Sequence, residues 1–227
     1  MKQSIILLFI LLSNIYTNAQ QKGSFFNSAE GKTYGTISIG KQIWMAENLN
    51  VSFFRNGDPI AEVKNDDEWD KAIRTGMPAW CYYNNNSGFG NVYGKLYNWF
   101  AVNDPRGLAP EGWHIPSDVE WILLTEFLGG EDKAGFKMKS IHFWESGLAK
   151  EPEELPIFNN SSGFSADPAG YRCRIGFLNV GGFGCWWTSS EYNTGTAWYR
   201  RLSRMNQGME RLSEQKNFGF SVRCVKD

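Results

Sequence analysis

The alternation of hydrophobic and polar residues changes along the chain, and each pattern predicts a different element. Residues 34–39 and 42–45 alternate on either side of Gly40, which predicts a β-hairpin that starts a sheet. In the middle of the chain, apolar residues recur three and four positions apart and predict an amphipathic helix. After Gly163, short aromatic segments are separated by Gly and Asn clusters, so we expect a second β region there.

The amphipathic helix has a clear start at Ser117. The Ser117 hydroxyl can accept a hydrogen bond from the backbone N–H of Glu120, and the Glu120 carboxylate can reach back to Ser117, which is a capping box. Gly129 and Gly130 then stop the helix. The apolar side, which should pack against a partner surface, is formed by Val119, Ile122, Leu123 and Phe127, with Leu124 and Leu128 on its flank.

Shorter patterns predict the remaining elements. Residues 65–74 favour a short surface helix with an Asn or Asp cap, and residues 93–102 favour a second short helix. Pro105 and Gly107 indicate a turn over residues 104–107. The strand candidates are residues 81–83, 171–177, 185–190, 196–202, 209–212 and 218–225. Helices early and strands late predict an α+β domain.

Five sequence blocks carry a family resemblance. They are AWCYYNNN (79–86), GKLYNWFAVNDPRGLAPEGWHIPSDVEW (94–121), GFSADPAGYR (163–172), WWTSSE (186–191) and GFSVRCVKD (219–227). In this order they resemble the Fibrobacter succinogenes major paralogous domain (FISUMP), found in secreted and surface proteins of Bacteroidetes and Fibrobacteres. The resemblance implies one such domain over residues 31–227. It implies a location outside the cell rather than a particular activity.

The order of these blocks is also similar to that of the C-type-lectin-like architecture shared by formylglycine-generating proteins. The last strand of those proteins reads Gly-Phe-x-x-Arg-Cys or close to it, as residues 219–224 do here. This resemblance implies a mixed α+β fold with short helices, short antiparallel strands, long loops and paired terminal strands.

The N-terminus has the layout of a secretory signal peptide over residues 1–19. Lys2 precedes an apolar run over residues 5–12, and Ala19 closes the segment. Such a run is too short to cross a bilayer, which takes about 20 residues, so we expect no membrane span after cleavage. The predicted location is the periplasm, the cell surface or the medium. Residues 20–30 are polar and predict a flexible leader.

Composition limits the class of partner. The chain has 10 Trp, 9 Tyr, 16 Phe and 24 Gly, which is typical of an aromatic-packed, turn-rich protein. Its formal net charge of −1 argues against a nucleic acid or an anionic membrane, because both require a basic face. We therefore expect an extracellular glycan or a surface protein as the partner.

After export, the chain would be in an oxidising compartment, where disulfides can form. It has four cysteines, Cys81, Cys173, Cys185 and Cys224. We expect disulfides between Cys81 and Cys224 and between Cys173 and Cys185, although sequence alone cannot choose among the three pairings. The alternative is four free thiols packed as small apolar residues.

The sequence offers little for a metal or for catalysis. Only His114 and His142 are present, without a Cys-x-x-Cys motif, which argues against zinc. The carboxylates that can bind calcium are Asp104, Asp118, Glu120, Asp167 and Glu191, but no calcium-loop motif joins them, so we expect no cofactor. No Gly-x-Ser-x-Gly frames a serine, and we interpret His114 as packed or cap-linked. We expect no enzyme; an enzyme related to formylglycine-generating proteins is the alternative, with Cys173 and Cys185 as its copper ligands.

Aromatic rings next to amides favour a binding function, because rings cover the C–H faces of sugars and amides bond their hydroxyls. Strand alternation predicts that one ring of Trp186 and Trp187 faces out. The candidate ligand-binding residues are Trp187, Tyr192, Asn193, Trp198, Tyr83 and Asn85. A strip of basic residues, Arg200, Arg201, Arg204 and Arg211, is either a local basic surface or a solvated strand face. We expect a secreted, non-catalytic module that binds glycans; a protein-interaction or structural surface domain is the other alternative.

Overall fold

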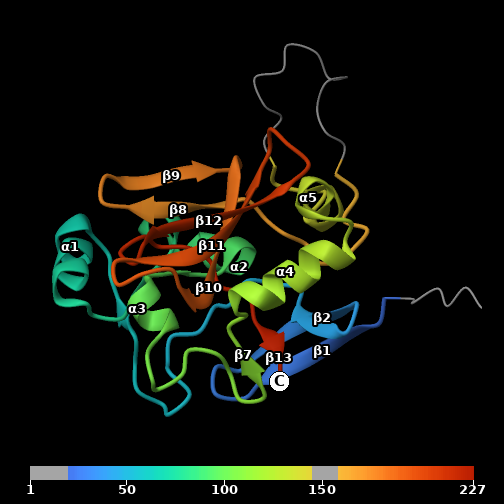
Figure 1. Ribbon diagram of the computed structural model, residues 1–227. Helices are drawn as coiled ribbons and strands as arrows, with labels where there is room; N and C mark the ends of the chain where they lie inside the picture. Colours follow the sequence, from blue (N-terminus) through green and yellow to red (C-terminus); the bar gives the residue numbers. More distant parts are fainter. Residues whose placement is uncertain (1–19, 145–157) are drawn as a thin grey trace, which may run out of the picture.

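The computed structural model describes residues 20–144 and 158–227 (Figure 1). The predicted signal peptide, residues 1–19, and residues 145–157 lie outside the described residues. Three sheets, built mostly of antiparallel strands, are surrounded by short helices, which confirms the mixed α+β class. In the described part of the chain, no helix has the length and hydrophobicity needed to cross a membrane.

The first sheet joins the two ends of the chain. Its strand order is β1 (Lys22–Asn27), β2 (Lys32–Ile39), β3 (Gln42–Met45), β13 (Val225–Lys226) and β7 (Trp113–His114). The predicted hairpin is confirmed, since β2 and β3 pair on either side of Gly40, whose φ of 61° suits glycine. Val225 pairs with both Trp44 and His114, so the C-terminal strand lies inside the sheet.

The polar segment predicted as a flexible leader is partly a strand, so that prediction is wrong. β1 pairs with β2 through six residue pairs, from Lys22 with Ile37 to Asn27 with Lys32. The backbone hydrogen bonds of β1 form whatever its side chains are. The Phe25 ring also anchors the strand, since its centre lies 5.3 Å from that of the Trp113 ring. Polar composition hid the strand because β1 lies at the edge of the sheet and most of its side chains face solvent.

The second sheet holds most of the predicted late strands. Its order is β12 (Met209–Gln215), β11 (Thr196–Ser203), β10 (Phe183–Glu191), β8 (Ala169–Cys173) and β9 (Gly176–Val180). A third sheet contains β4 (Ala61–Glu62), β5 (Ala79–Cys81) and β6 (Leu96–Tyr97). The strand predicted over residues 218–225 is mostly irregular, because Phe220 and Ser221 form only isolated bridges, to Tyr97 and Trp186.

Helices occur where they were predicted, but not always with the predicted length. α1 (Asp66–Thr75) starts at Asn65, whose side chain accepts from the Glu68 N–H, as expected. α3 (Trp99–Val102) is shorter than predicted because Leu96 and Tyr97 pair with β5 instead. The remaining helices are η1 (Tyr83–Asn85), η2 (Ser87–Phe89), α2 (Gly90–Tyr93), α4 (Asp118–Phe127) and α5 (Glu131–Met138).

The capping box of α4 is confirmed, but its predicted apolar side is wrong. The Ser117 hydroxyl accepts from the Glu120 N–H at 3.3 Å, and Glu120 accepts from the Ser117 N–H at 2.8 Å. Trp121 is fully buried, and its ring lies 4.8 Å from that of Trp44. Packing of this large ring turns the opposite side outward, so that Val119, Leu123 and Phe127 are 61%, 53% and 54% exposed. The buried members of the inner side are Trp121, Leu124 and Thr125.

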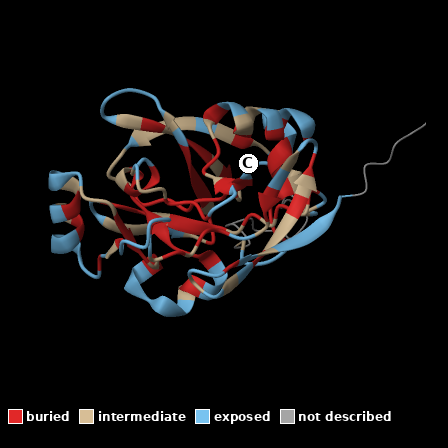
Figure 2. Cartoon of the chain, turned by 90° about the horizontal axis from the view of Figure 1, so that it is seen from below, coloured by how far each residue is buried: buried red, intermediate tan, exposed pale blue. Residues whose placement is uncertain are grey.

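Buried residues run through the centre of the molecule and separate the exposed helical faces (Figure 2). Trp186 and Trp187 are both fully buried, so the expectation that one faces out is wrong. The reason is that β10 is covered on both faces. Trp186 lies 6.4 Å from Trp121 of α4, and Trp187 lies 4.4 Å from Phe220 on the other side.

All four cysteines are free and buried, which corrects the predicted disulfides. Cys81 packs in a cluster around β5, whereas Cys224 packs with Cys185 in the central cluster, so the expected partners belong to different parts of the core. Burial raises the pKa of Cys81 and of Cys224 to about 12. The alternative, four thiols packed as apolar residues, is confirmed.

Thiol labelling tests this arrangement. The folded chain should react very slowly with a thiol reagent at neutral pH, because the thiols are buried and protonated. Unfolding in guanidinium without reductant should release four reactive thiols per chain. Recovery of two or none after unfolding would show that disulfides form.

Candidate binding cleft

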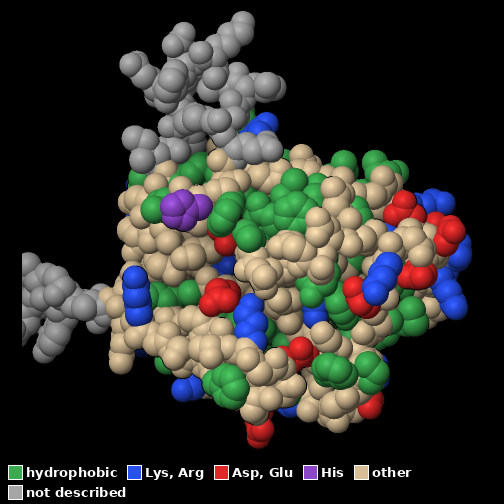
Figure 3. All heavy atoms as spheres, turned by 180° about the vertical axis from the view of Figure 1, so that it is seen from behind, with side chains coloured by type: hydrophobic (Ala, Val, Ile, Leu, Met, Phe, Trp, Pro, Cys, Tyr) green, Lys and Arg blue, Asp and Glu red, His purple; other side chains and the backbone are tan. Residues whose placement is uncertain are grey.

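A cleft of about 410 Å³ lies between the first sheet and α2. Its chemically active lining residues are Lys32, Glu47, Asn91, Phe143 and Asp167. Seen from behind, the molecule shows acidic, basic and hydrophobic side chains spaced over an otherwise uncharged surface (Figure 3). From these lining residues, the cleft has two carboxylates, an ammonium, an amide and a ring around one concave space.

The cleft borders a buried cation. Arg223 is fully buried and donates Nε and Nη2 to Asn48 Oδ1 at 3.1 and 2.7 Å. Its Nη1 donates to the carbonyls of Met45 and Phe164 at 3.2 and 2.5 Å. Burial lowers the pKa of Arg223 to about 10, which still leaves it charged at neutral pH. Asn48, which lines the cleft, is thus held rigidly by a charged partner.

The two carboxylates of the cleft differ in environment. Burial raises the pKa of Asp167, although a hydrogen bond with Ser140 and the charge of Arg223 act in the opposite direction. Glu47 is exposed, accepts from the Gly35 N–H at 3.0 Å and lies 3.5 Å from the Lys32 ammonium. Both carboxylates keep lone pairs for further donors, since each oxygen can accept two hydrogen bonds.

Phe143 gives the cleft its exposed ring. The side chain is 54% exposed, and its ring lies 6.0 Å from that of Tyr93 in an edge-on arrangement. Its φ of 66° is rare for a bulky residue, and such strain clusters at functional sites. The neighbouring amide, Asn91, is exposed.

Three predicted ligand-binding residues serve the fold instead. Trp187 is fully buried and donates Nε1 to the Tyr97 carbonyl at 2.9 Å. Tyr83 is only 7% exposed, and Asn85 accepts from Arg172 Nη1 at 3.1 Å. Trp187 and Tyr83 are thus part of the core, because the aromatic pattern of a core strand and that of a binding loop look alike in sequence, whereas Asn85 is an exposed amide whose oxygen is engaged by Arg172.

The other three predicted residues come together at an exposed corner. The rings of Tyr192 and Trp198 lie 4.7 Å apart, nearly perpendicular. The Asn193 side chain accepts from the N–H groups of Gly195 and Thr196, at 2.9 and 3.0 Å, within its own turn. This corner offers rings, but the oxygen of its amide is already engaged.

Most of the carboxylates considered for calcium, and most arginines of the predicted basic strip, form salt bridges with each other or with neighbouring residues. Asp118 binds Arg200 and Arg211, each at 2.8 Å, and Arg201 binds Glu210. The remaining pairs are Asp104 with Arg106, Glu120 with His114, and Glu191 with Lys216. Nowhere in residues 20–144 and 158–227 do three or more His, Cys, Asp or Glu gather as potential metal ligands. Of the five calcium candidates, only Asp167 lines the cleft.

A second cleft, of about 400 Å³, is lined by Phe25, Phe26, Phe53 and Phe54. Two of its charged side chains are used locally: Glu30 accepts from the N–H groups of Ser52 and Phe53, and Arg55 donates to the carbonyls of Ala109 and Trp113. The exposed Glu111 lines it as well, so this is a second candidate cleft, richer in rings than the first.

Sequence reasoning missed Glu47, Asn91 and Phe143, because each is an ordinary residue in an unremarkable local pattern. One signal was available. Gly94, Asp167 and Arg223 belong to three different blocks of the family resemblance, and the first two line the cleft while the third borders it.

A family model described as the Fibrobacter succinogenes major domain matches residues 37–226. No curated protein and no solved structure matches the chain.

His114 predicts a pH-dependent contribution to stability. Its Nε2 lies 2.7 Å from Glu120 and its Nδ1 2.7 Å from Asp227, which agrees with the cap-linked interpretation. Burial by itself lowers the pKa of His114, but the hydrogen bonds to the two carboxylates outweigh it and raise the pKa. The stabilisation is therefore complete below the unfolded value of about 6.5 and is lost as pH rises through the folded pKa.

Thermal unfolding of the parent chain and of His114→Asn should thus differ most in mildly acidic buffer, and the difference should shrink above neutral pH. If the difference in thermal stability between the parent chain and His114→Asn grows with pH, the interpretation is wrong.

Asn48→Ala tests the Arg223 contact. It removes the acceptor of Arg223 and of Trp186 Nε1, the latter at 2.8 Å, and leaves a buried cation poorly satisfied. We expect a loss of about 3 kcal/mol in the free energy of unfolding, measured in urea. Asn56→Ala, at an exposed turn, should change it by less than about 0.5 kcal/mol. Equal effects of the two substitutions would argue against the role of Asn48.

Proposed function

Since the chain belongs to the Fibrobacter succinogenes major domain family, we propose that it is a secreted, non-catalytic module that binds a glycan in the cleft of Glu47 and Asp167. The observation that carries this proposal is the convergence of two carboxylates, a free amide and an exposed ring on one concave surface. Of the other candidates, Trp187 and Tyr83 lie in the core, and Asn85 and Asn193 have their amide oxygens engaged within the protein.

The chemistry of the cleft suits a sugar. Carboxylates accept hydrogen bonds from hydroxyl groups, and the amide of Asn91 can both donate and accept. The exposed ring of Phe143 can cover an apolar C–H face, as aromatic rings do in recognition of amphipathic ligands. The rigid support of Asn48 by Arg223 lowers the ordering cost of binding, since the wall of the cleft is already in place.

Secretion and the C-type-lectin-like architecture are part of the same proposal. The layout of residues 1–19 supports export to the periplasm, the surface or the medium. The pairing of β3 with β13, which joins the N-terminal and C-terminal regions, supports the lectin-like architecture.

The thiols give no support to catalysis of the formylglycine-generating kind. Cys173 and Cys185 are free, as that alternative requires. Cys185 is nevertheless fully enclosed, and burial raises the pKa of its thiol, so the reactive thiolate is disfavoured at neutral pH.

A glycan array probed with the full-length chain tests the proposal, followed by titration of the best ligand. Asp167→Asn and Glu47→Gln should each weaken binding at least about tenfold, because a hydrogen bond to a charged group contributes about 1.5–3 kcal/mol. Phe143→Gly, which removes the ring and suits the positive φ, should also weaken binding while thermal stability holds or rises.

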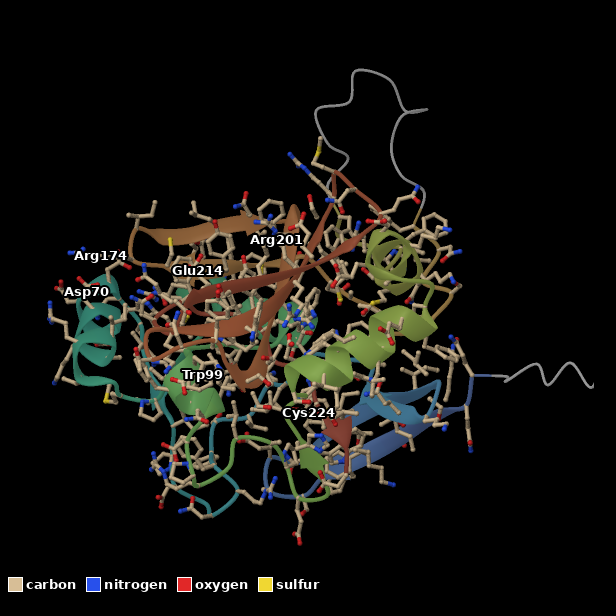
Figure 4. All side chains as sticks on the ribbon, viewed as in Figure 1. Asp70, Trp99, Arg174, Arg201, Glu214 and Cys224 are labelled. Carbon is tan, nitrogen blue, oxygen red and sulfur yellow. The ribbon has the colours of Figure 1, made fainter. Side chains whose placement is uncertain are left out.

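The matched control is Asp70→Asn, on α1 at the far side of the molecule from the cleft-lining β2 (Figure 4). It should leave the affinity unchanged. Absence of binding to any plant or microbial polysaccharide, or an affinity insensitive to both cleft carboxylates, would refute the proposal.

A further inference from the structure

The second cleft carries side chains of the same kinds as the first. The rings of Phe26 and Phe53 are 60% and 44% exposed and can cover apolar C–H faces of a ligand. The Glu111 carboxylate is exposed. Glu30 accepts its two backbone hydrogen bonds through Oε1, which leaves Oε2 for a hydroxyl group. Arg55 uses Nε and Nη2 on backbone carbonyls, so its Nη1 remains a donor for a ligand.

The two clefts are lined by neighbouring residues of the same two chain segments. Glu30 lines the second cleft and Lys32 lines the first, and two residues span at most about 7 Å of backbone. In the other segment, Asn48 lines the first cleft and Val51 the second, a span of at most about 11 Å. Only a few residues therefore separate one cleft from the other.

Hydrogen bonds hold these two segments together between the clefts. Glu30 accepts from the Ser52 N–H, and the Tyr34 hydroxyl accepts from the Asn50 N–H at 3.1 Å. The Asn50 side chain donates to the carbonyl of Gly90, which lines the first cleft, also at 3.1 Å. A ligand that reaches both clefts thus meets a wall that is already in place, which lowers the cost of ordering it.

Each cleft by itself is small. Their volumes of about 400 and 410 Å³ lie near the lower end of the range of about 300–1,000 Å³ that small-molecule sites occupy. A short ligand fills one cleft and leaves the rings and carboxylates of the other unused. A chain that repeats the same hydroxyl-rich unit can use both sets of contacts, and an oligosaccharide is such a chain.

The charges of the two clefts disfavour a charged chain of either sign. Four carboxylates and two cations line them together: Glu30, Glu47, Glu111 and Asp167 with Lys32 and Arg55. An acidic chain would bring its carboxylates against these four, and like charges across an interface are costly. A chain with many positive charges would face Lys32, Arg55 and the buried Arg223 behind Asn48. An uncharged chain meets neither penalty.

We propose that the two clefts are neighbouring subsites of one extended site, which binds an uncharged oligosaccharide chain. This inference rests on the proposed glycan function and deepens it, since it names the class of glycan and assigns a role to the second cleft. A short oligosaccharide is held by Glu47, Asp167 and Phe143 in the first cleft. A longer one also contacts Phe53 and Glu111 in the second.

Affinity as a function of chain length tests the proposal. The probes are a ladder from disaccharide to hexasaccharide, prepared from the uncharged polysaccharide that gives the strongest signal on the glycan array. They are titrated against the full-length chain by calorimetry. The affinity should rise at least about tenfold from disaccharide to hexasaccharide, because only the longer chain gains the ring and hydrogen-bond contacts of the second cleft.

Substitutions in the second cleft should affect long chains selectively. Phe53→Ala and Glu111→Gln should each lower the affinity for the hexasaccharide at least about threefold and leave that for the disaccharide unchanged. The matched controls are Tyr192→Ala and Glu126→Gln, which change an exposed ring and an exposed carboxylate outside both clefts. Neither control should change either affinity.

Thermal unfolding shows whether the variants remain folded, and Glu111→Gln at its exposed position decides the result if Phe53→Ala does not. A hexasaccharide that binds no more tightly than the disaccharide, or an affinity for it that both variants leave unchanged, overturns this proposal. So does an array on which acidic polysaccharides give the strongest signal. The glycan function itself survives those results if Asp167→Asn weakens binding, whereas the lack of any signal on the array refutes both.

Discussion

The fold depends on one buried interaction, the contact of Arg223 with the side-chain oxygen of Asn48. The two residues are 175 positions apart in the chain, and both are buried. A guanidinium removed from water must have its donors satisfied, and here they go to Asn48 and to the carbonyls of Met45 and Phe164. Two distant segments, residues 45–48 and Phe164, are thereby held to the C-terminal segment at Arg223. The candidate cleft lies where these segments meet.

Other buried cations act in the same way elsewhere. Arg172 lies between the rings of Trp69 and Phe177, 4.7 Å from each, and binds Asp66 of α1. Arg200 binds Asp118 and so fixes the start of α4 on the second sheet. Long loops carry few regular backbone bonds, and a cation with several donors can hold several loops at once. This arrangement explains how short elements form a stable frame with fixed clefts.

Two surfaces remain available once the core is accounted for. The cleft presents polar groups with free lone pairs, whereas the outer side of α4 presents the exposed side chains of Val119, Leu123 and Phe127. Recognition of a hydroxyl-rich ligand needs the polar surface. The glycan proposal therefore uses the cleft, whose wall includes Asn48, one of the residues that stabilise the frame.

The sequence by itself determined the local features: the hairpin around Gly40, the Asn65 cap, the capping box at Ser117, the turn at Gly107 and most late strands. Each depends on residues close together in the chain, so local chemistry was sufficient. The resemblance of five blocks determined the family in the same way.

Only the tertiary structure decided which side of each element faces the core. The apolar pattern of α4 allowed two orientations, and packing of Trp121 on Trp44 selected the one that exposes Leu123. Trp186 and Trp187 are both buried because β10 is covered on both faces. Cys81 and Cys224, expected to pair, pack in different parts of the core, and all four cysteines are free. Glu47, Phe143 and Asp167 meet only in space, since no local pattern records contacts between segments that are far apart in the chain.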